Sequence, residues 1–438
     1  MPLIFDHVHG YINFNQEDIP FLDNRWMKRL KRIKQLGLLD HVFPSGSHNR
    51  FEHSIGVYHL ASKYIEMLES QSDLNLFTDK EKRCIKLAGL FHDLGHGPYS
   101  HVFDSTLKDV NQSSYHRDKF NFSGCPLAVD HEYRSCLIVK QIMSEVKPHN
   151  LGDDDVKLIN MLINPPSVMI DKDDKGQKIY KHTKPYLFQI INNKINSIDV
   201  DKLDYLQRDA KHIGLDYAFD PERILNKSFV DLDSRSIVYD KSTKNNIFDL
   251  FYTRYRMHKD IYNHNTVKMC EFMLKDAIKS LICDYDDIFK IYQSCLLNKK
   301  NDSELFISDQ FLKLDDSLYT TILNWNTSTI NTILPVSLIH RIESRKLYKC
   351  IFTYTDKNYQ NCLKEKDKVI DKFNYYSDSD VYSYDILSFN FCNGETNPLE
   401  NVLFHDKYTN KISSENCNNR LVPNQFQEYY LLVYKSNT

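Results

Sequence analysis

The length, composition and charge of the chain indicate a globular protein and exclude several other classes. With 438 residues, 41% of them hydrophobic and 26% charged, the chain exceeds the roughly 250–300 residues at which one core usually stops growing, so a large and a smaller domain are expected. The net charge of −3 creates no overall field that would attract nucleic acid or an anionic membrane surface, so local basic groups must bind any anionic ligand.

The cysteines and the N-terminal segment indicate the cellular environment. The ten cysteines form no Cys-x-x-Cys pair, and we expect reduced, mostly structural thiols. The N-terminus has neither a basic region nor a continuous apolar stretch, and no window approaches 18 uninterrupted apolar residues. We therefore expect a soluble intracellular protein, cytoplasmic or nuclear, with no membrane partner.

The first predicted helix runs from Asp23, a suitable N-cap, to Gly37. Trp26, Leu30 and Ile33 recur within it at helical spacing. Six Arg and Lys side chains between residues 25 and 34 make the remaining surface basic. Such a run is more often a solvated helix face, but it can also bind an anionic effector or nucleic acid.

Two amphipathic helices are predicted next, over residues 53–68 and 79–95, and the second contains His92 and Asp93. Neighbours on a helix diverge by about 100°, so both side chains reach one ion only if it lies between them and other elements complete the coordination. Imidazole and carboxylate suit a borderline or hard divalent ion such as Fe, Mn, Zn or Mg. An isolated His-Asp pair also arises by chance, and a lone His is more often a core residue.

Loops and strands are predicted for the rest of the chain. Polar stretches with Gly or Pro predict surface loops at 105–130 and 165–185, and partial alternation predicts a hairpin at 228–248. After about residue 335, short aromatic and β-branched runs alternate with turn residues. We therefore predict a mainly α fold, with a helical core over residues 1–334 and a small α+β lobe over residues 335–438.

A fourth predicted helix, over residues 196–214, has a polar and an apolar face. The polar stripe consists of Asp201, Tyr205, Arg208, Asp209 and His212. The apolar stripe consists of Val200, Leu203, Leu206, Ala210 and Ile213. Tyr, Arg, Asp and His suit a cavity wall better than a solvated face, and Arg254, His258 and Tyr262 repeat the pattern in a later helix. A buried polar seam between helices is the alternative interpretation.

Together with His53 near the start of an earlier helix, His92, Asp93 and Asp201 form an H…HD…D arrangement. This arrangement resembles the signature of HD-domain metal-dependent phosphohydrolases. Six segments resemble, in order and with similar spacing, the catalytic core and C-terminal lobe of the SAM-and-HD-domain deoxynucleoside triphosphate (dNTP) triphosphohydrolases: IKQLGLLDHVFPSGSHNRFEHSIGV, LAGLFHDLGHGPYSHVFD, DHEYRS, NSIDVDKLDYLQRDAKHIGL, FYTRYRMHKDIYNH and NPLENVLFHDK. The resemblance extends from about residue 3 almost to the C-terminus. We expect the SAM domain to be absent.

The resemblance implies hydrolysis of a dNTP to deoxynucleoside and inorganic triphosphate, with water attacking the α-phosphorus. It implies a divalent metal ion whose ligands are His53, His92, Asp93 and Asp201. It implies a catalytic group of His96, His101, Asp104, His131 and Glu132. In that group His101 resembles the general acid for the departing 5′ oxygen, a role that suits an imidazole titrating near neutrality.

The resemblance also implies a substrate-binding set. Its members are Gln35, Leu36, Arg50, Lys202, Tyr205, Asp209, Arg254, Tyr262 and Asn263. The three basic members match phosphate clamps, because a triphosphate tail needs fixed cations. An apolar Leu36 facing C2′ would leave a ribose 2′-OH without a partner, at a cost of roughly 1–3 kcal/mol, so deoxyribose is favoured. Asn263 stands where the family has the longer Gln.

Nucleotide effectors, GTP or dNTP, are further partners implied by the resemblance, since they assemble family members into tetramers. The residues that match this apparatus are Asp23, Arg223 and Asn246. Asp260 and Asn265 instead stand where basic residues would face effector phosphates, and lost cations weaken anion binding. We therefore predict a homo-oligomer, dimer or tetramer, whose nucleotide-triggered assembly is altered or absent.

Two other functions stay open at this point. An HD-type nuclease or phosphodiesterase acting on nucleic acid or another nucleotide would use the basic helix at residues 25–34, and its binding to single strands would depend steeply on salt. A binding or scaffold protein with a relic site is the other alternative. The complete set of metal ligands argues against it.

Overall fold

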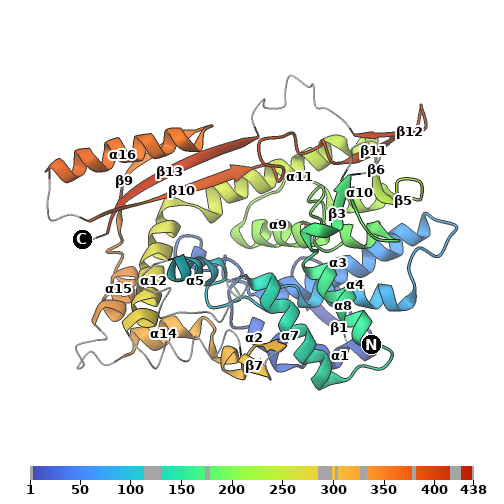
Figure 1. The fold of residues 1–438 in the computed structure, drawn as a ribbon, viewed down its shortest axis with the longest axis horizontal. Coiled ribbons are helices and arrows are strands. Elements are labelled where there is room, and N and C mark those ends of the chain that lie inside the picture. The colour runs from blue at the N-terminus through green and yellow to red at the C-terminus, as the bar shows by residue number, and fades with distance from the viewer. Residues whose placement is uncertain are drawn as a thin grey trace.

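The computed structural model shows a helical body with a β-rich region along one side (Figure 1). The described residues are 3–112, 130–172, 178–284, 298–300, 304–325, 333–376, 381–414 and 426–436. The predicted mainly α fold with a small α+β C-terminal region is confirmed. Among the helices that the structure describes, none combines the length and apolarity that a bilayer crossing requires.

The elements of the helical body follow one another along the chain. Its helices are α1 (Ile19–Leu22), α2 (Arg25–Leu30), α3 (Arg50–Ser70), α4 (Asp79–Phe91), α5 (His101–Gln112), α7 (His131–Val146), α8 (Asp153–Ile163), α9 (Val200–Ile213), α10 (Pro221–Asn226), α11 (Lys244–Arg256), α12 (Asn265–Asp284), α14 (Ser317–Leu323) and α15 (Ile333–Glu343). Short 3-10 turns are η1 (Gln16–Asp18), η2 (Leu39–His41), η4 (Ser167–Met169), η5 (Pro185–Gln189), η6 (Lys241–Thr243) and η8 (Asp309–Lys313), and a π-helical turn, η7 (Met257–Tyr262), continues α11. Separate antiparallel hairpins are β1–β2 (Leu3–Asp6, Gly10–Asn13), β3–β4 (Ile170–Lys172, Lys178–Tyr180) and β7–β8 (Asn298–Lys300, Glu304–Phe306).

The first predicted helix is wrong at both ends. The cap of α2 is Asn24, whose side chain accepts the Trp26 N–H, and the helix ends at Leu30. Lys34 then forms an isolated β-bridge with Asn49, the residue that caps α3. The basic run is largely solvated, as predicted, because Arg25, Lys28, Lys31 and Arg32 are exposed. Arg29 is fully buried, donates to the carbonyl of Leu314 and lies 4.2 Å from the ring centre of Phe311.

The predicted loops are only partly loops. Helix α5 continues through residues 105–112, because Leu107 and Val110 are buried at helical spacing; residues 113–129 lie outside the described part. The stretch 165–185 contains the β3–β4 hairpin. The hairpin predicted at 228–248 is confirmed as β5 (Ser228–Asp231) and β6 (Ser236–Asp240), but α11 already begins at Lys244.

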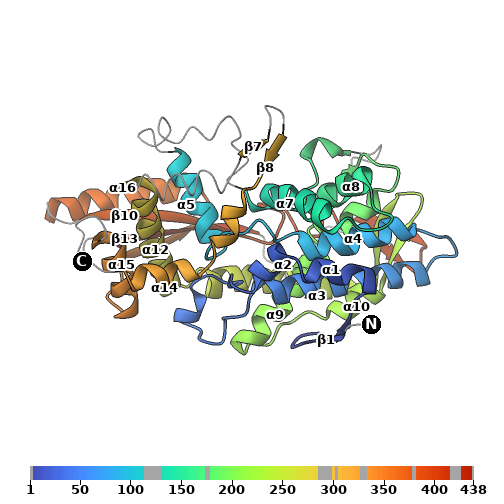
Figure 2. The same cartoon turned by 90° about the horizontal axis from the view of Figure 1, so that it is seen from below.

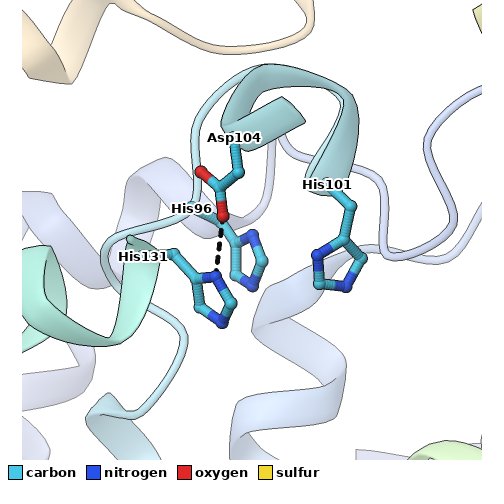
Figure 3. Close-up of side chains that lie close together, drawn as sticks. All are labelled: His96, His101, Asp104 and His131. Atoms are coloured by element: carbon cyan, nitrogen blue, oxygen red, sulfur yellow. Dashed lines mark hydrogen bonds and ion pairs between the residues drawn. The ribbon is translucent and has the colours of Figure 1, made fainter. Parts of the chain in front are cut away.

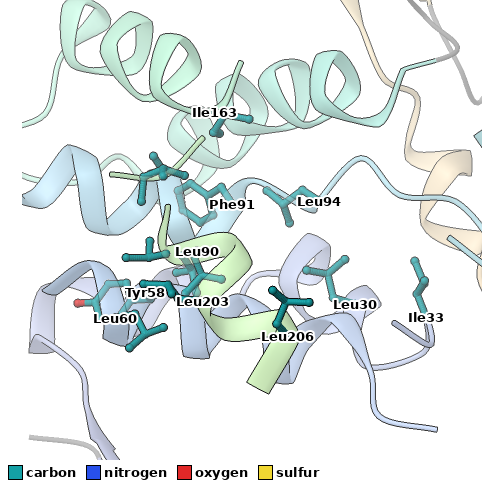
Figure 4. Close-up of a cluster of buried hydrophobic side chains, with 14 of the residues drawn as sticks. Leu30, Ile33, Tyr58, Leu60, Leu90, Phe91, Leu94, Ile163, Leu203 and Leu206 are labelled. Carbon is teal, nitrogen blue, oxygen red and sulfur yellow. The ribbon is translucent and has the colours of Figure 1, made fainter. Parts of the chain in front are cut away.

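Helices α3, α4 and α9 pack around a shared apolar core. Leu90 and Phe91 from the end of α4 pack in one apolar cluster with Tyr58 of α3 and with Leu203 and Leu206 of α9 (Figure 4). Each of these side chains is at least 98% buried, and burying one stabilises the fold by about 1.5–3 kcal/mol. This packing fixes the polar residues that neighbour them along the chain.

The C-terminal region forms two sheets. Strands β9 (Lys349–Asp356), β10 (Tyr382–Asn390) and β13 (Gln427–Lys435) form an antiparallel sheet with β13 in the centre, and α16 (Tyr359–Tyr376) packs against it. Figure 2 shows this sheet at one end of the molecule. Strands β11 (Leu403–Asp406) and β12 (Lys411–Ser414) join the β5–β6 hairpin in a four-stranded sheet of order β12-β11-β6-β5.

The predicted boundary between residues 334 and 335 lies inside α15, which packs against α12. One continuous apolar cluster also contains residues from both sides of that position, including Ile278 and Phe404. The division into two domains stays a prediction.

Candidate active site

The predicted metal ligands lie at the ends of three packed helices. Asn49 caps α3 by accepting the Glu52 N–H, which places His53 in the first turn. Asp199 caps α9 in the same way, by accepting the Lys202 N–H, and so places Asp201 in its first turn. Helix α4 ends at Phe91, directly before His92 and Asp93.

The four predicted ligands lie close together: the ligand atoms of His53, His92 and Asp93 are all within 4.8 Å of one another, and Asp201 lies beside the two imidazoles. The His53 Nε2 atom lies 3.1 Å from His92 Nε2, 3.0 Å from Asp201 Oδ1 and 3.7 Å from Asp93 Oδ2. The His92 Nε2 atom lies 3.5 Å from a carboxylate oxygen of both Asp93 and Asp201. Two imidazole nitrogens and two carboxylates form a donor set that fits a borderline or hard divalent ion.

The electrostatics of this group also fit a cation. Burial alone would lower the pKa of His53, but hydrogen bonds to Asp201 and Asp204 raise it to about 10. Burial opposes ionisation of Asp93, yet the charges of Arg50 and His92 hold its pKa well below the usual range. Carboxylates that stay ionised and make an imidazole retain its proton create a negative potential, which favours a bound cation.

Asp204 is a site residue that the sequence analysis missed. Its fully buried carboxylate bonds His53 Nδ1 at 2.8 Å and His9 Nε2 at 2.6 Å. His92 Nδ1 lies 2.8 Å from the carbonyl oxygen of Gly89, so both imidazoles are held through Nδ1 and present Nε2 to the ion position. Gly56 makes the approach of Asp204 possible, because a Cβ there would lie 2.0 Å from its Oδ1 atom.

Arg208 was predicted to belong to the cavity wall formed by α9, but it does not line the cavity. Its guanidinium is fully buried, and it donates to Asp204 at 2.9 Å and to Asp6 of the β1–β2 hairpin at 2.8 Å. Arg208 therefore belongs to the network behind His53. Asp204 and Arg208 are one helical turn apart on a face that the N-terminal hairpin covers, and no local pattern in α9 reveals that contact.

A second group of side chains lies beside the first (Figure 3). His131 Nδ1 lies 2.7 Å from Asp104 Oδ2, and Arg134 pairs with the other Asp104 oxygen. The ring of His96 stacks on that of His131 at 3.8 Å, while His101 faces both rings from the start of α5. The ligand atoms of His96, His101, Asp104 and His131 lie within 4.8 Å of one another, so this group is also close enough to hold an ion.

Two members of the predicted catalytic group have properties that the sequence did not indicate. Desolvation, followed by repulsion from Arg50 and His131, lowers the pKa of His101 to about 4, although the residue remains exposed at the start of α5. Glu132 accepts hydrogen bonds from Asn192 and Lys194, each at 3.1 Å.

One cavity of about 660 Å³ joins the two groups, and ligand cavities typically have roughly 300–1,000 Å³. Apart from Asp104, every predicted metal, catalytic and substrate-binding residue lines it. Within the described residues, Gln35 Oε1, His96 Nδ1 and Arg254 Nε are buried without a hydrogen-bond partner in the protein. Buried polar atoms of this kind are available to a ligand.

Hydrogen bonds within the protein hold the predicted substrate-binding residues in place. Asp209 accepts hydrogen bonds from the Tyr262 hydroxyl at 2.6 Å and from His48 at 2.7 Å. Lys202 pairs with Asp199 at 2.8 Å, and Arg254 Nη1 donates to the carbonyl oxygen of Asn390 at 3.1 Å. Asn263 donates its amide to the carbonyl oxygen of His258 at 2.8 Å.

Several lining residues were not predicted as site residues. They include Asn192, Asn193, Lys194, Ser197, His258, Lys268 and Glu271. His258 carried a usable signal, because it belongs to the polar stripe of Arg254 and Tyr262. The segment at residues 192–197 carried none, since it joins the site only through tertiary packing.

The residues predicted to bind effectors lie outside the cavity lining. Asp23 pairs with Lys28 at 3.2 Å beside the end of α1. Asn246 bonds the backbone of Asp220, the residue that caps α10, while Arg223 of α10 donates to the carbonyl oxygen of Ser242.

Comparisons with known proteins agree with this geometry. The HD domain family matches residues 50–209, a range that contains all four predicted metal ligands. An HD domain-containing protein of Acanthamoeba polyphaga mimivirus is 35% identical over 92% of this chain and 84% of its own length. The deoxynucleoside triphosphate triphosphohydrolase SAMHD1 homolog of Dictyostelium discoideum is 30% identical over 99% of this chain and 77% of its own length. The human SAMHD1 enzyme is 27% identical over 99% of this chain and 70% of its own length.

Proposed function

The chain belongs to the family of HD-domain phosphohydrolases related to SAMHD1, and on that premise we propose that it hydrolyses a dNTP to a deoxynucleoside and inorganic triphosphate. One observation carries the proposal. A single cavity is lined by a metal donor set, an imidazole group and the three basic side chains of the predicted phosphate clamp, Arg50, Lys202 and Arg254. A general phosphodiesterase would not need the third feature.

The proposed metal ligands are His53, His92, Asp93 and Asp201. A divalent ion bound by them would supply Lewis-acid polarisation of an α-phosphate oxygen and of the attacking water. Asp204 and the carbonyl group of Gly89 orient the two imidazoles. The identity of the ion, Fe, Mn, Zn or Mg, follows from metal analysis of the purified protein.

The triphosphate tail is bound by Arg50, Lys202 and Arg254. Arg50 is buried and already paired with Asp93, so it links a metal ligand to the phosphate position. Arg254 carries a buried Nε–H without a protein partner, and a guanidinium favours paired phosphate oxygens. Cations that are partly buried attract a polyanion more strongly than exposed ones do.

The sugar is bound by the wall of Tyr205, Asp209 and Tyr262, with Gln35 and Leu36 beside it. Each oxygen of Asp209 already accepts one hydrogen bond, but a carboxylate oxygen has a second lone pair that can accept from a 3′-OH. Leu36 offers no partner to a 2′-OH. Both features favour deoxyribose.

His101 is the proposed proton donor to the leaving O5′ atom. Its low pKa in the protein alone arises from desolvation and from the charge of Arg50. A bound triphosphate offsets the charge of Arg50 and adds negative charge nearby, so it raises the pKa of His101. In the complex with substrate, His101 is therefore protonated. Water adds its oxygen to the α-phosphorus, the bond to O5′ breaks, O5′ takes the His101 proton, and the proton lost by the water returns through solvent to the imidazole.

Product analysis tests the reaction. The purified protein is incubated with Mn²⁺ or Fe²⁺ and each dNTP in ¹⁸O-labelled water, with Asp201→Asn as the inactive variant. Because Asp216 is exposed just beyond the end of α9, Asp216→Asn is the matched control. We expect triphosphate carrying the label, together with an unlabelled deoxynucleoside. Pyrophosphate and a deoxynucleoside monophosphate would contradict the proposal.

The helix that supported a nucleic-acid substrate is largely neutralised. Arg25 pairs with Glu145 and Asp309, and Arg32 pairs with Asp315. Arg29 is buried, and Lys34 pairs with Asp40. These contacts favour the nucleotide substrate over the nuclease alternative.

We also propose that the enzyme is a homo-oligomer, with altered or absent assembly on GTP. Asp260 pairs with Arg256 at 3.3 Å, and Asn265 accepts a hydrogen bond from Tyr430 at 3.0 Å, so neither adds a cation for an effector phosphate. Light scattering during size-exclusion chromatography, with and without GTP, checks this. A tetramer that forms only with GTP would contradict it.

A further inference from the structure

The turn that precedes His101 has an unusual backbone. Tyr99 and Ser100 both adopt left-handed conformations, with φ of 58° and 59°. Residues other than glycine cost about 1–3 kcal/mol in such sparsely populated conformations, and they persist only where the surroundings hold them. The next residue, His101, starts α5 and faces the cavity. Whatever holds this turn therefore also sets the direction of His101.

A carboxylate from a distant segment holds one side of the turn. Asp316, which directly precedes α14, accepts the Tyr99 N–H through Oδ1 at 2.7 Å and the Lys34 N–H through Oδ2 at 2.8 Å. The Tyr99 hydroxyl donates to the backbone carbonyl oxygen of Asp316 at 2.7 Å. One side chain thus joins two loops, and Tyr99 is bound to Asp316 at both its backbone and its ring.

The other side of the turn is bound by residues of the site itself. The Ser100 hydroxyl accepts from Arg50 Nε at 2.7 Å and donates to the Lys34 carbonyl oxygen at 2.7 Å. Gly37 lies against the turn, since a Cβ there would approach the Tyr99 carbonyl oxygen to 3.2 Å. Lys34 is consequently fixed through its N–H by Asp316 and through its carbonyl by Ser100, which closes a ring of contacts around the turn.

We propose that Asp316 is a positioning residue that holds the Tyr99–Ser100 turn in its left-handed form and so presents His101 to the cavity. The proposal rests on the proposed function of His101. Asp316 does not line the cavity, so its effect passes through the turn. An Asn at this position would keep one accepting oxygen and set an NH₂ group against the second backbone N–H, and that N–H would lose its partner.

A double-mutant cycle tests whether Asp316 acts through His101. We expect Asp316→Asn to lower kcat about 10- to 100-fold, the scale of a misplaced catalytic group, with KM and metal content unchanged. In a His101→Ala background the same change is expected to lower kcat no further, because the group that it positions is gone. If the decreases in kcat caused by the two substitutions multiply in the double variant, the proposal is overturned.

Asp315→Asn is the matched control. Asp315 sits in the same segment, but it bonds Arg32 and the Ser317 N–H and makes no hydrogen bond to the turn. We expect it to leave kcat unchanged, so an equal loss of kcat in this variant would show general loosening of the segment and overturn the proposal. Tyr99→Phe removes the hydroxyl contact alone, and we expect a smaller decrease than in Asp316→Asn.

Amide hydrogen exchange separates this proposal from the proposed function. Measured without any nucleotide, Asp316→Asn is expected to speed exchange at Tyr99 and Lys34 and at the start of α5, while residues near Asp201 keep their protection. Unchanged exchange at Tyr99 and Lys34 would overturn the proposal even in an active enzyme. Failure to hydrolyse any dNTP would instead contradict the proposed function and leave the exchange result as evidence for the turn.

Discussion

The two groups of ionisable side chains share one cavity, but their surroundings shift the imidazole pKa values in opposite directions. Carboxylates around His53 raise its pKa to about 10, whereas desolvation and Arg50 lower that of His101 to about 4. The first group stands at the ends of α3, α4 and α9, and His101 of the second group follows the left-handed turn of Tyr99 and Ser100. A site that separates the pKa values of its groups in this way can bind a cation in one half and transfer a proton to an anionic substrate in the other.

Removing a proposed metal ligand should give the largest effect. We expect Asp201→Asn to lose the bound ion and to lower kcat/KM by at least about 10³-fold, because the removed charge also served the transition state. Mass-spectrometric metal analysis of the purified protein is the measurement. His131→Ala serves as the comparison, and full metal content in that variant would show that the second group binds no ion. If His131→Ala loses one equivalent of metal, the second group also binds an ion, which contradicts the proposed difference between the two groups.

His101→Ala should affect the second group alone. We expect kcat to fall by about 10²–10⁴-fold, the usual contribution of a general acid, with metal content unchanged. Steady-state kinetics with the best dNTP checks this. Adding imidazole to the variant is the control, since partial rescue would identify the missing group as a proton donor. A decrease confined to KM would contradict the role.

Asp204→Asn should weaken the first group without removing a ligand. A buried partner of a metal-binding imidazole is typically worth about 10- to 100-fold in metal affinity, and we expect a loss in that range by metal titration. Arg208→Gln is the matched control, because it breaks the same buried pair and leaves the bond between Asp204 and His53. Equal losses in the two variants would mean that the network acts through overall stability.

The pH dependence of stability should report on Asp316. Burial raises the pKa of its carboxyl from 3.8 to about 6, although the N–H groups of Lys34 and Tyr99 oppose that shift. The raised pKa means that this group stabilises the fold below pH 4 and that the contribution is lost as pH rises through 6. We expect the unfolding free energy of the natural protein, relative to Asp316→Asn, to fall by on the order of 1–2 kcal/mol between pH 4 and 7.5. Urea unfolding at both pH values checks this, and a difference independent of pH would contradict it.

Local sequence patterns predicted the parts of the site that lie on single helices. Helical spacing placed Asp201, Tyr205 and Asp209 on one face of α9, and all three line the cavity. The same spacing failed for Arg208, because the face that it occupies is covered by a hairpin about 200 residues earlier in the chain. Periodicity shows which residues share a face, but tertiary packing decides what covers it.

The other features that the sequence did not predict also depend on contacts between distant segments. Asp316 and Asp204 act on residues 217 and 151 positions away, and neither stands in a local motif. Helix α2 ended early because Arg29 and the following turn pack against the segment at residues 311–316. The short aromatic strands of the C-terminal region were predicted correctly, since each run carries its own signal. Their pairing with β6 carried no such signal.

Because β11 pairs with β6, the C-terminal residues cover an edge of the sheet that would otherwise be open. Strand β6 is buried along its whole length and pairs in parallel with β11. A chain shortened before Leu403 would remove the strand that pairs with β6 at Tyr239 and Asp240 and would uncover that edge of the sheet. Such an open edge is a template for another strand, so we expect the shortened protein to self-associate.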